Sequence, residues 1–85
     1  MSVRPILLSE MTRIADENQK SLPPLVDDLV MLETEFDSLC FALLVAGMEE
    51  RTGLDPFTEM DMADLPVTVG ELVALYDRAQ AHAAA

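Results

Sequence analysis

The feature that most constrains the fold is a helical spacing of apolar side chains that recurs in three segments. In the first segment, residues 5–19, Leu7, Met11 and Ile14 fall at positions i, i+4 and i+7. The other two segments repeat this spacing with Phe41, Leu44, Val45 and Met48, and with Val69, Leu72, Val73 and Tyr76. Such spacing places apolar side chains on one face of a helix. Because no segment shows a convincing strand pattern, we predict an all-α fold.

Proline, glycine and capping residues divide the chain between these helices. Pro23 and Pro24 follow the first helix, and Gly53 is suited to end a second helix over 38–52. Thr68, followed three residues later by Glu71, predicts a capping box at the start of the last helix.

Two linking segments complete the predicted architecture. The long connection 20–36 contains apolar residues, so we expect it to pack on the core. Residues 56–63 should form one or two helical turns. We therefore predict a small four-helix bundle with three longer helices, a short third helix and a long first loop. A single domain should span 1–85, with a core at about 5–80 and a frayed tail at 81–85.

The net charge of the chain limits the classes of partner that it is expected to bind. Five Lys or Arg against 16 Asp or Glu give a formal net charge of -11. A field of this sign disfavours nucleic acid and anionic membrane surfaces, and it favours basic protein surfaces. Residues 27–64 hold 11 acids and a single base, Arg51, so this segment is the expected docking region.

Cysteine usage and hydropathy indicate a cytoplasmic protein. The single cysteine, Cys40, cannot form an internal disulfide, which suits a reducing compartment. Its position favours a small apolar side chain over a reactive thiol. No segment is long and apolar enough to span a bilayer. The sequence shows no zinc pattern and no Rossmann signature, and one histidine, His82, offers no basis for catalysis. We therefore expect no enzyme activity and no metal.

The triplet Asp37, Ser38, Leu39 stands at the start of the second predicted helix. Ser38 can be interpreted in two ways. Its hydroxyl can accept a hydrogen bond from a free backbone N–H and so cap the helix, and Asp37 can supply the same chemistry. Alternatively, the hydroxyl can face solvent, where another protein could modify it.

The triplet resembles the attachment site of the acyl carrier and peptidyl carrier protein family. The resemblance rests also on Met48, Glu49 and Glu50, on Gly53, and on the string 68–73, which is similar to the family's Thr-Val-Gly-Asp-Leu-Val. It covers about residues 5–80. The spacing between Ser38 and the string is close to that of the family.

The resemblance implies a carrier that acts in trans, as a monomer. A phosphopantetheinyl transferase would move 4′-phosphopantetheine from coenzyme A to Ser38, and the arm would hold acyl or aminoacyl groups as thioesters. Asp37 would help the transferase to dock, and Leu39 would contact partner enzymes, which are acyl or aminoacyl ligases, synthases or transferases. Glu49 and Glu50 form either a solvated face or a contact for basic partner residues.

The chain also departs from the family pattern. Glu35 stands where the family usually has Gly, and the often acidic positions after the triplet are apolar here, at 40–43. These departures favour a specialised biosynthetic pathway over general fatty-acid synthesis. They also leave open an alternative, a non-covalent acidic helical interaction module without a prosthetic group.

Overall fold

A computed structural model describes residues 2–57, 60 and 65–84 of the chain. Within these residues it contains the helices α1 (Val3–Glu17), α2 (Ser38–Thr52) and α3 (Val69–Ala84), and one 3₁₀ turn, η1 (Met31–Glu33). The described residues form no strand, and their one isolated bridge pairs Val30 with Thr68. The predicted all-α class is confirmed.

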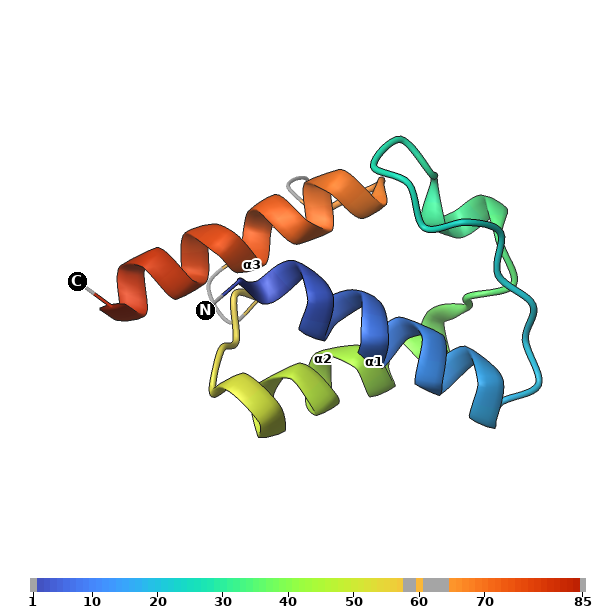
Figure 1. Cartoon of the computed structure of the whole chain (residues 1–85), viewed down its shortest axis with the longest axis horizontal. Helices are drawn as coiled ribbons and strands as arrows, with labels where there is room; N and C mark the ends of the chain where they lie inside the picture. The colour runs from blue at the N-terminus through green and yellow to red at the C-terminus, as the bar shows by residue number, and fades with distance from the viewer. Residues whose placement is uncertain (1, 58–59, 61–64, 85) are drawn as a thin grey trace.

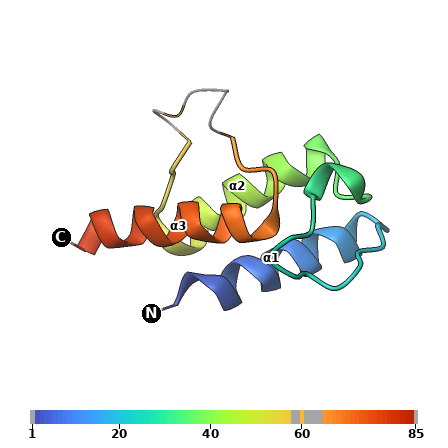
Figure 2. The same cartoon turned by 90° about the horizontal axis from the view of Figure 1, so that it is seen from above.

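The three helices pack side by side, and α1 contacts both of the others. Figures 1 and 2 show that α1 runs antiparallel to α2 and α3. The first residues of α1 and the last turn of α3 lie at one end of the molecule. The starts of α2 and α3 lie at the opposite end, together with the connection 20–36 and η1 (Figure 1). The predicted site and the string 68–73 therefore lie at the same end.

The core lies between the predicted apolar faces of the helices. Every helix contributes residues that are almost fully buried, and the connection contributes two more: Val3, Leu7, Met11, Ile14 and Ala15 of α1, Cys40, Leu44 and Met48 of α2, Val69, Leu72, Val73 and Tyr76 of α3, and Met31 and Phe36 of the connection. Phe41 and Val45 are only half-buried. The predicted stripes of the first and last helices are thus confirmed, as is the packing of the connection on the core.

The first helix ends earlier than predicted, and the prolines do not end it. The backbone N–H of Gln19 donates to the oxygen of Asp16 at 3.2 Å, and that of Lys20 donates to the oxygen of Ala15 at 2.7 Å. Gln19 adopts a φ of 59° between them. This pattern is a Schellman motif, in which a left-handed residue turns the chain away from the helix axis. Glycine usually occupies that position, so glutamine gave no local signal for this boundary.

The second helix has the predicted bounds. Gly53 follows it with a φ of 75°, and its N–H donates to the oxygen of Glu49 at 2.8 Å. Glycine adopts this left-handed conformation without the steric penalty of a Cβ atom, which explains why the helix ends here.

A buried carboxylate joins α1 to α2. Glu10 is 2% exposed, and its side chain lies 2.7 Å from Arg13 and 3.4 Å from Arg51 of α2. Gly47 of α2 faces this cluster, since a Cβ atom there would lie 3.5 Å from Glu10 Oε1. The lack of a side chain at Gly47 thus leaves room for side chains of α1 at this point of α2. Removing either arginine would leave the buried carboxylate of Glu10 less well paired, which destabilises a fold.

Backbone hydrogen bonds fasten the connection to the start of α3. The N–H of Gly70 donates to the oxygen of Asp27 at 2.8 Å, and the N–H of Val69 donates to the oxygen of Leu29 at 3.0 Å. The N–H of Met31 donates in turn to the oxygen of Val67 at 3.1 Å. These bonds supply partners for N–H groups that a helix start leaves unpaired. They also hold the segment that leads into α2.

Phe57 packs the segment after α2 against the helices. The centroid of its ring lies 5.6 Å from the ring centroid of Phe41 and 6.1 Å from that of Tyr76, in edge-to-face geometry. Burial raises the pKa of Tyr76 far above its ordinary value.

α3 extends to Ala84, so residues 81–84, which we predicted as a frayed tail, are helical. The short helix predicted at 56–63 falls mostly outside the described residues, and Pro56 and Phe57 lie in a turn. It stays a prediction.

Candidate functional site

Ser38 is the first residue of α2, and its side chain is exposed. Asp37 takes the N-cap position, where its Oδ1 accepts a hydrogen bond from the N–H of Cys40 at 3.0 Å. Of the two capping residues that the sequence allowed, the structure uses Asp37. Because an aspartate at the N-cap already satisfies this N–H, the start of the helix does not depend on the hydroxyl of Ser38.

The carboxylate of Asp37 has a second contact on its other oxygen. Lys20 Nζ lies 3.5 Å from Asp37 Oδ2. The hydrogen bond from Cys40 lowers the pKa of Asp37, and the nearby ammonium of Lys20 lowers it further. Asp37 is therefore charged at neutral pH. The sequence gave no signal for this pair, because the two residues belong to different elements.

Cys40 lies on the buried side of the same helical turn. It is fully buried, and burial raises the pKa of its thiol above the ordinary value. A thiol that stays protonated and inaccessible is a poor nucleophile. This placement agrees with the predicted apolar role of Cys40.

An apolar groove of about 370 Å³ lies beside Ser38. We call it the serine groove, and it is lined by Met31, Leu32, Phe36, Asp37, Ser38, Phe41, Leu65, Pro66 and Val67. Its walls thus come from the connection, from the first turn of α2 and from the segment before α3. Leu32 is 86% exposed at this groove and Val67 is 50% exposed, so apolar surface faces solvent there.

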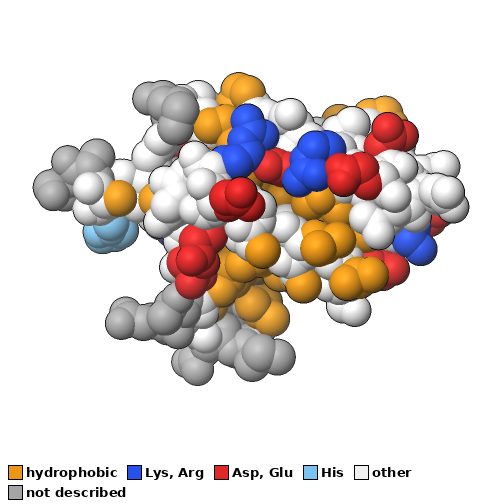
Figure 3. Space-filling model, turned by 90° about the horizontal axis from the view of Figure 1, so that it is seen from below, with side chains coloured by type: hydrophobic (Ala, Val, Ile, Leu, Met, Phe, Trp, Pro, Cys, Tyr) orange, Lys and Arg blue, Asp and Glu red, His pale blue; other side chains and the backbone are white. Residues whose placement is uncertain are grey.

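Leu39 is exposed, as the resemblance implied. It is 60% exposed, and Leu43, one turn further along α2, is 40% exposed. Figure 3, seen from the side on which α2 lies in Figure 1, shows a band of hydrophobic side chains with acidic and basic side chains around it. Exposed apolar side chains that share a face in this way are typical of protein contact surfaces.

Glu49 and Glu50 are exposed at the far end of α2. Glu49 lies eleven positions after Ser38 along the helix, so the helix rise puts about 16 Å between them. The structure therefore brings Asp37, Ser38 and Leu39 together in one turn and leaves the two glutamates apart from them. Only a partner that covers most of α2 could contact both groups.

The string 68–73 opens α3 with the predicted cap. Thr68 Oγ1 accepts from the N–H of Glu71 at 3.1 Å. The hydroxyl of Thr68 also donates to Glu71 Oε1 at 3.1 Å, so the glutamate contacts the hydroxyl of the cap residue. Gly70 lies against the connection, because a Cβ atom there would come within 3.0 Å of the Asp27 backbone oxygen.

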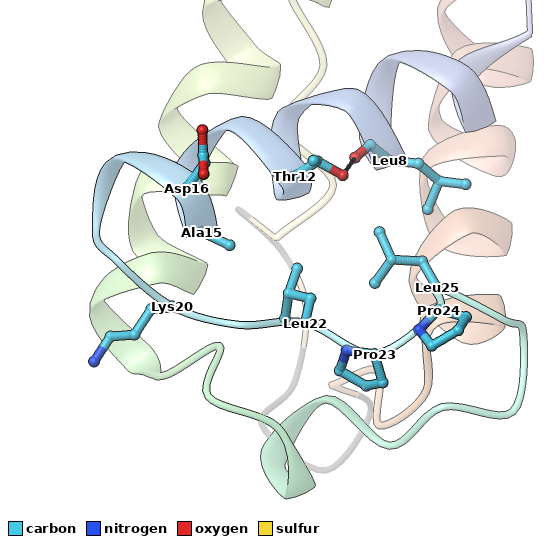
Figure 4. A pocket seen from close by; sticks show the side chains of 9 residues that line it. All are labelled: Leu8, Thr12, Ala15, Asp16, Lys20, Leu22, Pro23, Pro24 and Leu25. Carbon is cyan, nitrogen blue, oxygen red and sulfur yellow. Dashed lines mark hydrogen bonds between the residues drawn. The ribbon is translucent and has the colours of Figure 1, made fainter.

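A larger cavity of about 480 Å³ lies between α1 and the segment that follows it. Figure 4 shows Leu22 and Leu25 pointing from that segment toward α1, on which Leu8 and Thr12 lie. The hydroxyl of Thr12 donates to the oxygen of Leu8 at 2.9 Å and is thereby satisfied within the helix. The cavity brings together few polar groups that could orient a ligand.

Among residues 2–57, 60 and 65–84, no three His, Cys, Asp or Glu side chains gather in a way that could hold a metal ion. In the same residues, no helix has the length and apolar character required to cross a membrane.

Comparison with known proteins yields no relative: no protein-family model, no curated protein and no solved structure matches the chain.

Proposed function

We propose that the chain is a carrier protein whose Ser38 accepts 4′-phosphopantetheine from coenzyme A. The observation that carries the proposal is that Asp37, and not Ser38, caps the start of α2. Asp37 caps the helix, which leaves the hydroxyl of Ser38 exposed and free of a structural task. A residue in that position is open to a modifying enzyme.

The surroundings of Ser38 fit the group that it would receive. A phosphodiester on Ser38 would lie at the start of a helix, where free N–H groups and the helix dipole favour an anion. Asp37 would remain the cap, and the serine groove offers apolar surface next to the attachment point. When bound, the arm would supply a terminal thiol that holds an acyl or aminoacyl group as a thioester.

The transfer step would use the hydroxyl oxygen of Ser38 as its acceptor. Ser38 Oγ would form a bond to the phosphorus of coenzyme A that bears pantetheine. The P–O bond to adenosine 3′,5′-bisphosphate would break, and the hydroxyl proton would pass to a base of the phosphopantetheinyl transferase. This chain supplies only the acceptor oxygen and its orientation. It is therefore a substrate of the transferase and, in this proposal, has no enzyme activity of its own.

The exposed face of α2 is the proposed docking surface. Leu39 and Leu43 supply apolar contact, and Asp37, Glu49 and Glu50 supply charge for basic residues of the transferase and of acyl or aminoacyl ligases, synthases or transferases. Charge of this kind mainly speeds association. We further propose that 56–63 adds the short helix of a four-helix, acyl-carrier-type domain, and that the protein works in the cytoplasm.

Intact-mass spectrometry tests the proposal directly. The purified chain is incubated with coenzyme A, magnesium and a broad-specificity phosphopantetheinyl transferase. We expect a gain of one phosphopantetheine moiety for the wild type and for Ser21→Ala, since Ser21 is another exposed serine of the chain. Ser38→Ala should gain nothing. No gain on the wild type, or an equal gain on Ser38→Ala, would refute the proposal.

The exposed apolar surface also suits a second function. An acidic helical module could bind a partner through the serine groove and Leu39 without any modification. Partner capture from the native host separates the two functions. Equal capture by the wild type and by Ser38→Ala, together with an unmodified mass of the protein from that host, would favour the non-covalent module.

A further inference from the structure

The end of α1 holds the backbone of Lys20 in a fixed position. Two hydrogen bonds close the Schellman motif, and the Lys20 N–H donates the shorter one, at 2.7 Å, to Ala15. Gln19 accepts the left-handed conformation that this motif requires. Such a conformation is unfavourable for a residue other than glycine, so the surrounding contacts must maintain it.

The side chain of Lys20 extends from this fixed point toward the candidate site. Figure 4 shows its ammonium pointing away from the leucine and proline side chains of the neighbouring cavity. Its Nζ lies 3.5 Å from Asp37 Oδ2, and 34% of the side chain is exposed. The other ion pairs between described residues involve Arg4, Arg13 and Arg51 and lie outside the triplet 37–39.

A cation at this place has a specific electrostatic consequence. The chain has a net charge of -11, and Asp37 puts a carboxylate next to the acceptor serine. Coenzyme A and the phosphodiester that it would leave on Ser38 are both anionic. Without Lys20, the approaching phosphate would meet an unscreened carboxylate. A unit charge about 4 Å away in water changes an equilibrium about five-fold.

We propose that Lys20 is a positioning residue for the modification of Ser38, because it screens Asp37 and so favours an anionic phosphate at the neighbouring hydroxyl. This inference rests on the proposed function. Lys20 acts through its charge alone: it gives and takes no proton, and the transfer step remains as described above.

The first test measures the initial rate of arm transfer against carrier concentration for Lys20→Gln. At low salt and saturating coenzyme A we expect kcat to fall about three- to five-fold, because the lost charge acts on the phosphate at the hydroxyl, while KM for the carrier does not rise. At about 1 M salt, screening should remove the difference. Lys20→Arg should restore the wild-type kcat. Arg4→Gln is the matched control, because Arg4 and Asp27 form a similarly exposed ion pair away from Ser38, and this variant should match the wild type.

The second test needs no transferase. An NMR titration of the Asp37 carboxyl group in the unmodified protein should show a higher pKa in Lys20→Gln than in the wild type, and no change in Arg4→Gln. Thermal unfolding of each variant shows whether the fold persists. If Lys20→Gln is modified as fast as the wild type at low salt, or if Asp37 titrates unchanged, the inference is overturned while the proposed function stands. A wild-type chain that accepts no arm would overturn both.

Discussion

Gly70 provides the sharpest test of how the connection is held on α3. A Cβ atom at this position would lie 3.0 Å from the backbone oxygen of Asp27 and 3.0 Å from its Cβ atom. Contacts this short require one of the two segments to move. One of these two neighbours, the Asp27 backbone oxygen, accepts the hydrogen bond of the Gly70 N–H at 2.8 Å. This oxygen belongs to the backbone, so it cannot rotate away as the end of a flexible side chain could.

The expected effect of Gly70→Ala follows from three contributions. Overpacking costs about 1–3 kcal/mol, and losing the hydrogen bond to Asp27 costs about 1 kcal/mol more. The better helix propensity of alanine offsets about 1 kcal/mol. We therefore expect the free energy of unfolding to fall by about 1–3 kcal/mol.

Gly47→Ala is the matched control and should have the opposite sign. The same Cβ atom there would meet Glu10 Oε1 at 3.5 Å, an ordinary contact distance. Gly47 lies in the interior of α2, where alanine in place of glycine stabilises a helix by up to about 1 kcal/mol. Two helical glycines of the same chain should thus respond in opposite directions to the same added methyl group.

Urea unfolding followed by far-UV circular dichroism measures both variants. The linear extrapolation gives the free energy of unfolding, and an unchanged slope shows that the same surface is exposed in each variant. If Gly70→Ala is as stable as the wild type, the connection does not lie against α3 as described. If Gly47→Ala is clearly destabilised, the spacing of α1 and α2 is wrong.

Four further predictions use the same unfolding measurement. Asp37→Ala should lose about 1 kcal/mol with its cap, whereas Ser38→Ala should change stability by less than about 0.5 kcal/mol; an equal loss in both would give Ser38 a structural role. Because folding lowers the pKa of Asp37, its stabilisation is present above the unfolded value of about 3.9 and is lost as the pH falls through the folded pKa, so the difference between the wild type and Asp37→Asn should shrink in acid. Gln19→Gly should raise the free energy of unfolding by about 1 kcal/mol, since it relieves the left-handed strain; a loss of stability would contradict the motif at the end of α1. Leu44→Ala should cost about 2–5 kcal/mol and Leu39→Ala very little, because only the first is buried; comparable losses would refute the assigned faces of α2.

Sequence reasoning succeeded where the signal is local. The bounds of α2 follow from a capping aspartate before it and a glycine after it, and both residues act through neighbours within one turn. The core faces of α1 and α3 follow from spacing alone. The cap of α3 is predictable for the same reason, because Thr68 accepts from the N–H of Glu71, which is only three residues away.

The features that the sequence did not predict depend on contacts between elements. Glu10 is buried between α1 and α2, where Arg51 of the other helix lies 3.4 Å from it, and no spacing pattern in the sequence indicates this contact between helices. Lys20 reaches Asp37 only because the chain turns at Gln19, after the end of α1, and glutamine has little preference for the left-handed conformation found there. The choice of Asp37 over Ser38 as the cap likewise depends on a geometry that two adjacent capping residues leave open.

The opposed ends of the molecule have a practical consequence. The first residues of α1 and the last turn of α3 lie at one end, and the start of α2, to which Ser38 belongs, lies toward the other (Figures 1 and 2). A purification tag or a sensor chip joined to either terminus would therefore leave the serine turned outward, toward solution. Immobilised in this way, the protein could be probed with soluble enzymes without the attachment blocking their access.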